Sequence, residues 1–106
     1  MKSKLESYLG FARKSGNLIF GAGTCEISMD KGKVKLLIIT EDTAENTRKK
    51  LIPKAERLGI PYIIYGLSDE ISRITGTSGR TIFAITDTNF ANVITEQIES
   101  EKKEVL

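Results

Sequence analysis

The sequence predicts a layered α/β fold in which helices cover both faces of a sheet. Short aliphatic runs alternate with segments of helical periodicity along the whole chain. One run, Leu36 to Ile39, is aliphatic at every position, which is typical of a strand buried on both faces. The 106 residues, 40% hydrophobic and 28% charged, fit one globular domain spanning residues 1–106. Strands that alternate with helices of this length favour the layered arrangement.

The first predicted helix opens with a capping box, because Glu6 stands three residues after Ser3. An apolar face follows at helical spacing, formed by Leu5, Tyr8, Leu9 and Ala12. The turn residues 15–17 end this helix, and residues 18–20 are a short candidate strand.

Gly21 to Thr24 begin a second helix with a narrow apolar face, for which Gly32 is a plausible end. That face consists of Ala22, Cys25 and Met29. The buried strand then extends over residues 34–40. Thr43 is the expected cap of a third helix, in which Pro53 predicts a kink or a restart because its ring removes an amide donor.

The remaining chain predicts two more strands and two more helices. Gly59 ends the third helix, and residues 61–65 form a strand. A short helix runs from residue 68 to Gly76, with acidic residues in its first turn, where the helix dipole favours them. A last strand over residues 81–86 leads to a final helix capped by Asp87 or Thr88. Its C-terminal tail, about residues 99–106, is charged, and residues 99–104 are expected to fray.

Missing residue types exclude several functions. The chain has no His and one Cys, which excludes a Ser-His-Asp triad, a His-ligated metal site and an internal disulfide. No run is long enough to span a membrane, and the N-terminus has no apolar signal core. We therefore expect a cytoplasmic protein with no catalytic residues, metal or other cofactor. A Lys- or carboxylate-based enzyme is the least favoured alternative.

Gly21-Ala22-Gly23 could hold an anion, since it follows a strand and opens a helix whose first amides are free. The alternative is that both glycines serve only a tight turn. Glu26 stands where a dinucleotide fingerprint needs a third glycine, and no Gly-Lys-Ser/Thr of a P-loop is present. Cys25, near the same helix start, is interpreted as a core residue because no His is available as its base.

Basic residues are concentrated in the first part of the chain. Residues 1–60 carry 12 Lys+Arg and 7 Asp+Glu, whereas residues 61–106 carry 4 and 7. Lys33, residues 48–50 and Arg80 are predicted to flank one end of the strands, where they would suit a phosphate backbone. The alternative is a set of solvated faces. The carboxylates of Glu41 and Asp42 have a sufficient explanation in helix capping.

Aromatic residues are too few for binding that stacks base after base, which disfavours a single-strand binder. Four of them are assigned to core faces: Tyr8, Phe11, Phe83 and Phe90. Structured RNA, recognised by shape and phosphates, fits this composition better.

Four blocks of sequence, in order along nearly the whole chain, resemble one known family. They are residues 9–18 followed by Gly21, residues 36–42 followed by 45–47, residues 59–62, and residues 81–87 followed by 90–92. Together they are similar to the YlxQ-type bacterial group within the superfamily of ribosomal proteins L7Ae and L30e. The resemblance implies a three-layer α/β/α sandwich with a central mixed four-stranded sheet. It also implies non-catalytic binding of RNA, by a monomer, in a ribosomal or other ribonucleoprotein setting.

Relatives in that superfamily bind kink-turns, which are sharply bent internal loops of RNA. The three segments that bind the RNA correspond here to residues 21–26, 41–43 and 76–80. The RNA-binding candidates are Gly21, Gly23, Thr24, Lys33, Glu41, Asp42, Arg48, Thr77, Ser78 and Arg80. Structured RNA is thus the expected partner, with ribosome-associated proteins as a further class.

One block departs from the kink-turn readers, which carry Gly-x-Asn-Glu at the start of the second helix. This chain has Gly21-Ala22-Gly23-Thr24, and Ile27 replaces a Lys of the first helical turn. Guanine recognition by the Asn and Glu side chains is therefore not implied. The loss of this pair motivates the alternative hypothesis of a protein-interaction module.

Overall fold

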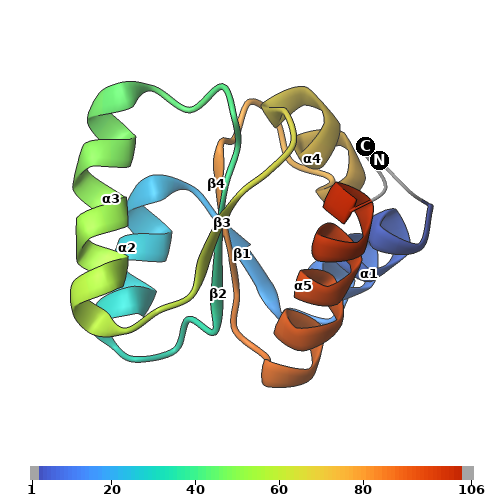
Figure 1. Ribbon diagram of the computed structural model, residues 1–106, viewed down its shortest axis with the longest axis horizontal. Coiled ribbons are helices and arrows are strands. Elements are labelled where there is room, and N and C mark those ends of the chain that lie inside the picture. Colours follow the sequence, from blue (N-terminus) through green and yellow to red (C-terminus); the bar gives the residue numbers. More distant parts are fainter. Residues whose placement is uncertain (1–2, 104–106) are drawn as a thin grey trace.

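The computed structural model describes residues 3–103, the side chain of Ser3 excepted, so the capping box predicted at Ser3 lies outside the described residues. Helices and strands alternate throughout, as predicted (Figure 1). They are α1 (Ser3–Lys14), β1 (Leu18–Phe20), α2 (Ala22–Asp30), β2 (Leu36–Ile39), α3 (Glu45–Leu58), β3 (Tyr62–Ile64), α4 (Ser68–Thr75), β4 (Ile82–Ile85) and α5 (Thr88–Lys103).

The four strands form one mixed sheet in the order β1-β4-β2-β3. Strand β2 pairs in parallel with β3, while β4 is antiparallel to both β1 and β2. It follows that β1, β2 and β3 all end at the edge of the sheet where β4 begins. This edge is called the upper edge, because it lies at the top of the sheet in Figure 1.

Helices cover both faces of the sheet and confirm the predicted sandwich. Figure 1 shows α2 and α3 on one side of the sheet and α1, α4 and α5 on the other. The side chains of β2 alternate between the two faces, since Leu36 and Ile38 belong to one core cluster and Leu37 and Ile39 to the other. All four are buried, as the aliphatic run predicts.

The predicted cap of α3 is wrong, and a restart, one of the two alternatives predicted at Pro53, does not occur. Thr43 does not cap the helix, because its Oγ1 lies 3.0 Å from that of buried Thr40 and its own residue is only 7% exposed. Ala44 precedes the helix and accepts the first amide hydrogen bonds through its backbone carbonyl. Pro53 causes no restart, since α3 continues through it to Leu58. Pro53 is exposed, so its ring projects into solvent, and the carbonyl of Lys49 that lacks an amide partner lies on that same exposed face.

Two residues assigned to buried faces are exposed instead. Phe11 is 58% exposed because it lies about 200° around α1 from buried Leu9. Ala22 is exposed at the start of α2, and the buried residues of that helix are Cys25 and Met29.

The final helix is longer than expected. Asp87 caps it by accepting a 2.8 Å hydrogen bond from the amide of Phe90, as predicted. Residues 99–103, expected to fray, continue α5 to Lys103, while residue 104 lies outside the described part. The hydroxyl of Tyr65 donates a 2.6 Å hydrogen bond to Glu101 and so ties this end to the sheet.

Among the helices of residues 3–103, none combines the length and the apolar composition that a membrane span requires.

Candidate functional site

Three separate segments meet at the upper edge of the sheet. The amide of Gly21 donates to the carbonyl of Ile82 at 2.9 Å, which places the start of α2 beside the start of β4. The amide of Thr40 donates to the carbonyl of Thr81 at 3.0 Å, which brings the β2–α3 loop to the same place. The topology thus brings together residues 21–24, 40–43 and 76–81, although they are far apart in the sequence.

Gly21 has a backbone conformation that only glycine adopts readily. Its φ is +93°, and a Cβ built there would lie 3.5 Å from Nη1 of Arg80. Gly21 is also the N-cap residue of α2 and supplies no side chain to the first amides of the helix. Gly23 and Thr24 follow on the exposed surface, and a Cβ at Gly23 would meet nothing within 4 Å. An incoming group can therefore approach this turn closely.

Arg80 extends across this turn from the segment that precedes β4. Its backbone amide donates a 3.0 Å hydrogen bond to the hydroxyl of Ser72, which is buried in α4. Its guanidinium carbon lies 5.4 Å from the ring centroid of Phe20, the last residue of β1. The backbone of Arg80 is thus fixed on α4, while its exposed side chain lies beside Gly21.

Asp42 in the β2–α3 loop caps a helix that is distant in sequence. Its carboxylate accepts hydrogen bonds from the hydroxyl and the amide of Ser68, at 2.6 and 3.1 Å, at the start of α4. Hydrogen bonds from the Ser68 hydroxyl and then from Thr40 lower the pKa of Asp42 from 3.8 to about 2. The predicted capping role of the carboxylate is confirmed, and the capped helix is α4, not the adjacent α3.

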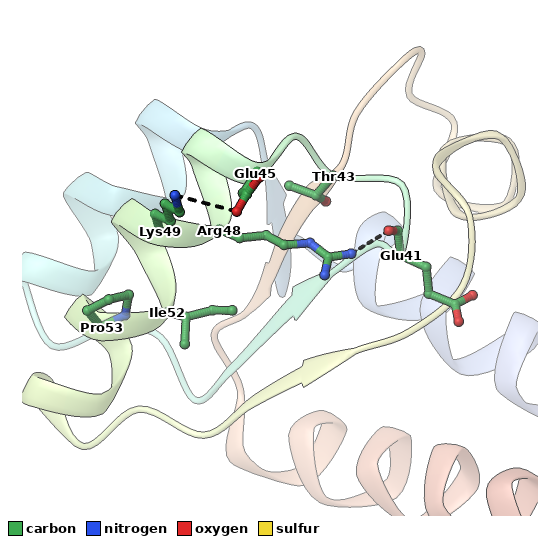
Figure 2. Close-up of a pocket in the computed structure, with 7 residues that line it drawn as sticks. All are labelled: Glu41, Thr43, Glu45, Arg48, Lys49, Ile52 and Pro53. Atoms are coloured by element: carbon green, nitrogen blue, oxygen red, sulfur yellow. Dashed lines mark hydrogen bonds and ion pairs between the residues drawn. The ribbon is translucent and has the colours of Figure 1, made fainter.

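The side chain of Arg48 extends from α3 to Glu41 in the same β2–α3 loop (Figure 2). Its Nη2 donates to the backbone carbonyl of Glu41, and its Nε is buried without a hydrogen-bond partner in the described part of the chain. An open groove of about 590 Å³ lies here, lined by Glu41, Thr43, Glu45, Arg48, Lys49, Ile52 and Pro53. Because two carboxylates line it, the groove is not a purely cationic surface.

The loop between α4 and β4 completes the upper edge. Gly76 ends α4 in the left-handed conformation, as predicted, and Gly79 has a φ of +63°. The amide of Thr77 donates to the carbonyl of Ser72 at 2.8 Å, while its hydroxyl lies 3.2 Å from that of Thr75. Ser78 is exposed at the tip of the loop. Thr77 is thus held by α4, and Ser78 projects from it.

The structure separates Lys33 from the other predicted basic residues. Lys33 lies in the connection before β2, where the amide of Lys35 donates to the carbonyl of Ile85 at the end of β4. This is the edge of the sheet opposite to Gly21. The prediction that Lys33 flanks the same end is wrong, because β2 crosses the sheet between Lys33 and the β2–α3 loop.

The lysines of α3 are paired with acids. Lys50 and Lys54 lie 3.1 and 3.2 Å from the carboxylate of Glu26 on α2, and Lys54 is also 2.9 Å from Asp30. Hydrogen bonds from Lys50, and then Lys54, lower the pKa of Glu26. Lys49 pairs with Glu45 within α3 at 3.4 Å. These lysines form the predicted alternative, a solvated face, here braced by ion pairs between two helices.

Cys25 is a core residue, as interpreted from the sequence. It is fully buried, and its thiol donates weakly to the carbonyl of Ile19 at 3.9 Å. Burial raises its pKa to about 12, so the reactive thiolate is disfavoured. No three His, Cys, Asp or Glu side chains within residues 3–103 are grouped so that they would hold a metal ion.

Arg13 and Phe20 belong to this edge, and sequence reasoning did not single them out as site residues. The guanidinium carbon of Arg13 lies 5.1 Å from the ring centroid of Phe20. The available signal was weak, since a basic residue in the last turn of a helix is common for its effect on the dipole alone.

The fold and this edge define a class of protein, an α/β/α sandwich that presents three loops at one end of a mixed sheet. Residues 3–95 match the model of the ribosomal protein L7Ae/L30e/S12e/Gadd45 family, and the chain belongs to this family. The resemblance inferred from the four sequence blocks is thereby confirmed.

Individual relatives agree with this assignment. The chain is 30% identical over 84 residues to the RNA-binding protein YlxQ of Bacillus subtilis (strain 168). The aligned residues cover 79% of this chain and 84% of the relative. It is also 30% identical over 98 residues to the RNA-binding protein YlxQ of Enterococcus faecium, covering 92% and 94%. The chain is therefore a YlxQ-type member of the family.

Solved structures share the fold. A Bacillus halodurans protein of unknown function superposes with a TM-score of 0.88 at 26% identity, over 92% of this chain and 99% of the other. A 15.5 kD RNA-binding protein of Giardia lamblia superposes with a TM-score of 0.74 at 20% identity, over 94% and 92%. The second likeness concerns the fold alone.

Proposed function

We propose that this chain is a non-catalytic RNA-binding protein that holds structured RNA at the upper edge of its sheet. The carrying observation is the position of Arg80, a cation beside a glycine turn with no acidic partner within residues 3–103. Two YlxQ relatives are described as RNA-binding proteins, which supports the same conclusion. The setting we propose is a ribosomal or other ribonucleoprotein particle of the cytoplasm, with the protein as a monomer.

The roles of the edge residues follow from their chemistry. Gly21, Gly23 and the uncapped first turn of α2 permit close approach of a phosphate to backbone amides. Thr24 offers one hydroxyl, and Arg80 a charged fork suited to phosphate. Ser78 offers a second exposed hydroxyl on the facing loop. Asp42, Thr77 and Arg48 act within this proposal by fixing the loops, because their polar groups are engaged inside the protein.

We further propose that recognition of a kink, where it occurs, depends on backbone approach and Thr24. Gly23 has no side-chain group that could contact a base edge, and phosphate contacts carry no sequence information by themselves. The expected specificity is thus for RNA shape. A protein partner is the second candidate, favoured by Ile27, which is 58% exposed on α2 next to the proposed interface.

A fluorescence anisotropy titration tests this proposal, with a kink-turn RNA and a matched duplex lacking the bulge, each at two salt concentrations. Tighter binding to the kink-turn would support recognition of the bent shape. Equal, salt-sensitive binding to both would support phosphate contacts without kink-turn specificity. Absence of binding to both would contradict the RNA proposal. Recovery of a cellular protein that persists after nuclease treatment would then favour the protein partner.

A further inference from the structure

Two arginines from distant parts of the chain converge on one aromatic ring. Arg13 stands in the last turn of α1, Phe20 ends β1, and Arg80 precedes β4. Their guanidinium carbons lie 5.1 and 5.4 Å from the ring centroid of Phe20, within the range of cation–π attraction. We call these two residues the arginine pair. Because both guanidinium carbons lie close to one ring centroid, the two positive charges are held within about 10 Å of each other, next to the turn at Gly21.

The arginine pair has no acidic partner within residues 3–103, whereas Arg73 has one. Within residues 3–103, neither guanidinium forms an ion pair or a side-chain hydrogen bond. Arg73 by contrast lies 3.8 Å from Glu6, and Arg48 donates to a backbone carbonyl. The Nε of Arg13 is buried and has no hydrogen-bond partner among these same described residues. Two like charges held near one ring repel each other, and an anion that contacts both guanidiniums would offset that repulsion.

The geometry points to a phosphate group as the ligand, and not to a base. Phe20 is half-buried and already contacts both guanidiniums, which compete with a base for the ring. A phosphate accepts hydrogen bonds from the edges of the guanidinium planes and leaves their stacking intact. The fixed fork of arginine suits the oxygen atoms of phosphate.

We propose that Arg13 and Arg80 together bind a phosphodiester group of the RNA, so that the interface extends from the Gly21 turn to the end of α1. This inference rests on the proposed function and adds to it a residue outside the three loops. Arg13 takes part although α1 packs on the other face of the sheet from α2 (Figure 1). The edge strand β1 makes this possible, because its last residue, Phe20, borders both α1 and the Gly21 turn.

The test compares Arg13→Met with Lys14→Met, each titrated with whichever of the two RNAs the wild type binds more tightly. Methionine keeps an unbranched apolar stem on Phe20 and removes only the charged fork. Lys14 is the adjacent exposed cation, so its variant has the same net charge. We expect Arg13→Met to weaken binding about tenfold and to reduce the salt slope by about one contact. We expect Lys14→Met to change affinity less than about twofold.

The outcome separates the inference from the function on which it rests. If Arg80→Met weakens binding while Arg13→Met behaves like Lys14→Met, the arginine pair is wrong and RNA binding stands. If the wild type binds neither RNA, both are contradicted. Circular dichroism melting of each variant shows whether folding is intact. If Arg13→Met unfolds, Arg13→Lys, which keeps the charge but not the fork, is used instead, and unchanged affinity of that variant overturns a role for the fork.

A double-mutant cycle and a free-anion titration complete the test. Because both arginines would hold one group, the loss for Arg13→Met/Arg80→Met should be smaller than the product of the single losses. Independent, multiplying losses would contradict a shared phosphate. Inorganic phosphate at constant ionic strength should not saturate the wild type below about 1 mM. Saturation below that level, abolished by Arg13→Met, would assign the site to a free anion instead of RNA.

Discussion

Two groups of cations in this molecule differ in what their charges meet. Lys50 and Lys54 of α3 face Glu26 and Asp30 of α2, and their ion pairs brace two helices against each other. Arg13 and Arg80 face an aromatic ring and have no acidic partner within residues 3–103. A count of basic residues along the sequence favours the α3 cluster. The structure teaches that position in the sequence does not tell which cations are paired inside the protein and which keep their charge for an external anion.

The largest expected effect is on stability, at Gly21, whose turn lies beside Arg80. We expect Gly21→Ala to lower the free energy of unfolding by about 2 kcal/mol, because a residue with a Cβ is strained at a φ of +93°. Gly23→Ala is the matched control, since that position is helical and open and alanine favours a helix. Urea denaturation of both variants measures the difference. Equal stability of the two variants would show that the positive φ of Gly21 does not restrict this position to glycine.

Arg80 gives the most direct contrast between the two cation groups. Arg80→Met should weaken RNA binding about tenfold, or about 1.4 kcal/mol, and evenly across RNA sequences. Lys50→Met removes one equal charge from the paired group and should change RNA affinity less than about twofold. Anisotropy titrations at two salt concentrations measure both effects. An unchanged salt slope for Arg80→Met would remove Arg80 from the interface.

Asp42 sharpens the comparison, since it is an acid at the upper edge whose carboxylate is engaged inside the protein. Asp42→Ala removes the cap of α4 and should lower the free energy of unfolding by about 1 kcal/mol. Asp69→Ala is the control, an exposed acid in the first turn of the same helix. Thermal melting of both variants measures the loss. A larger loss for Asp69→Ala would contradict the assignment of the cap.

The same carboxylate predicts a dependence of stability on pH. Because the folded pKa of Asp42 is about 2 and its ordinary value is 3.8, its stabilising contribution is present above about pH 4. It is lost as pH falls from about 4 towards 2, when the folded carboxylate takes up a proton. Urea midpoints of the wild type and Asp42→Asn should therefore converge over this interval. A constant difference down to pH 2 would exclude the carboxylate as the cause.

The smallest effect is expected at Lys54. Its side chain is 13% exposed and lies between Glu26 and Asp30, whose hydrogen bonds, with that from Asp30 first, raise its pKa. Lys54→Met should destabilise the protein slightly, less at high salt, and leave RNA binding unchanged. Urea denaturation at low and high salt measures the first effect. A large loss of RNA affinity would break the distinction between paired and unpaired cations.

Much of the fold follows from local features of the sequence. Aliphatic runs, helical spacing and glycine stops predict every element in its order, with limits that differ by a few residues. The family resemblance adds the mixed sheet. The errors have particular causes: tertiary packing draws Thr43 into the core beside Thr40, and Phe11 stays outside because it lies about 200° around α1 from buried Leu9.

The site was predicted less completely, because its residues are adjacent only in space. The sequence by itself determined the turn at Gly21, since glycine alone combines a positive φ with close approach, and it placed Arg80 just before a strand. Only the tertiary structure decided which charges are free. The packing of α2 on α3 paired the lysines, and the ring of Phe20 gathered Arg13 and Arg80, whereas Lys33 lies at the opposite edge because β2 separates it from the β2–α3 loop. Pairing of charges depends on distances of a few ångströms, which spacing along the chain does not contain.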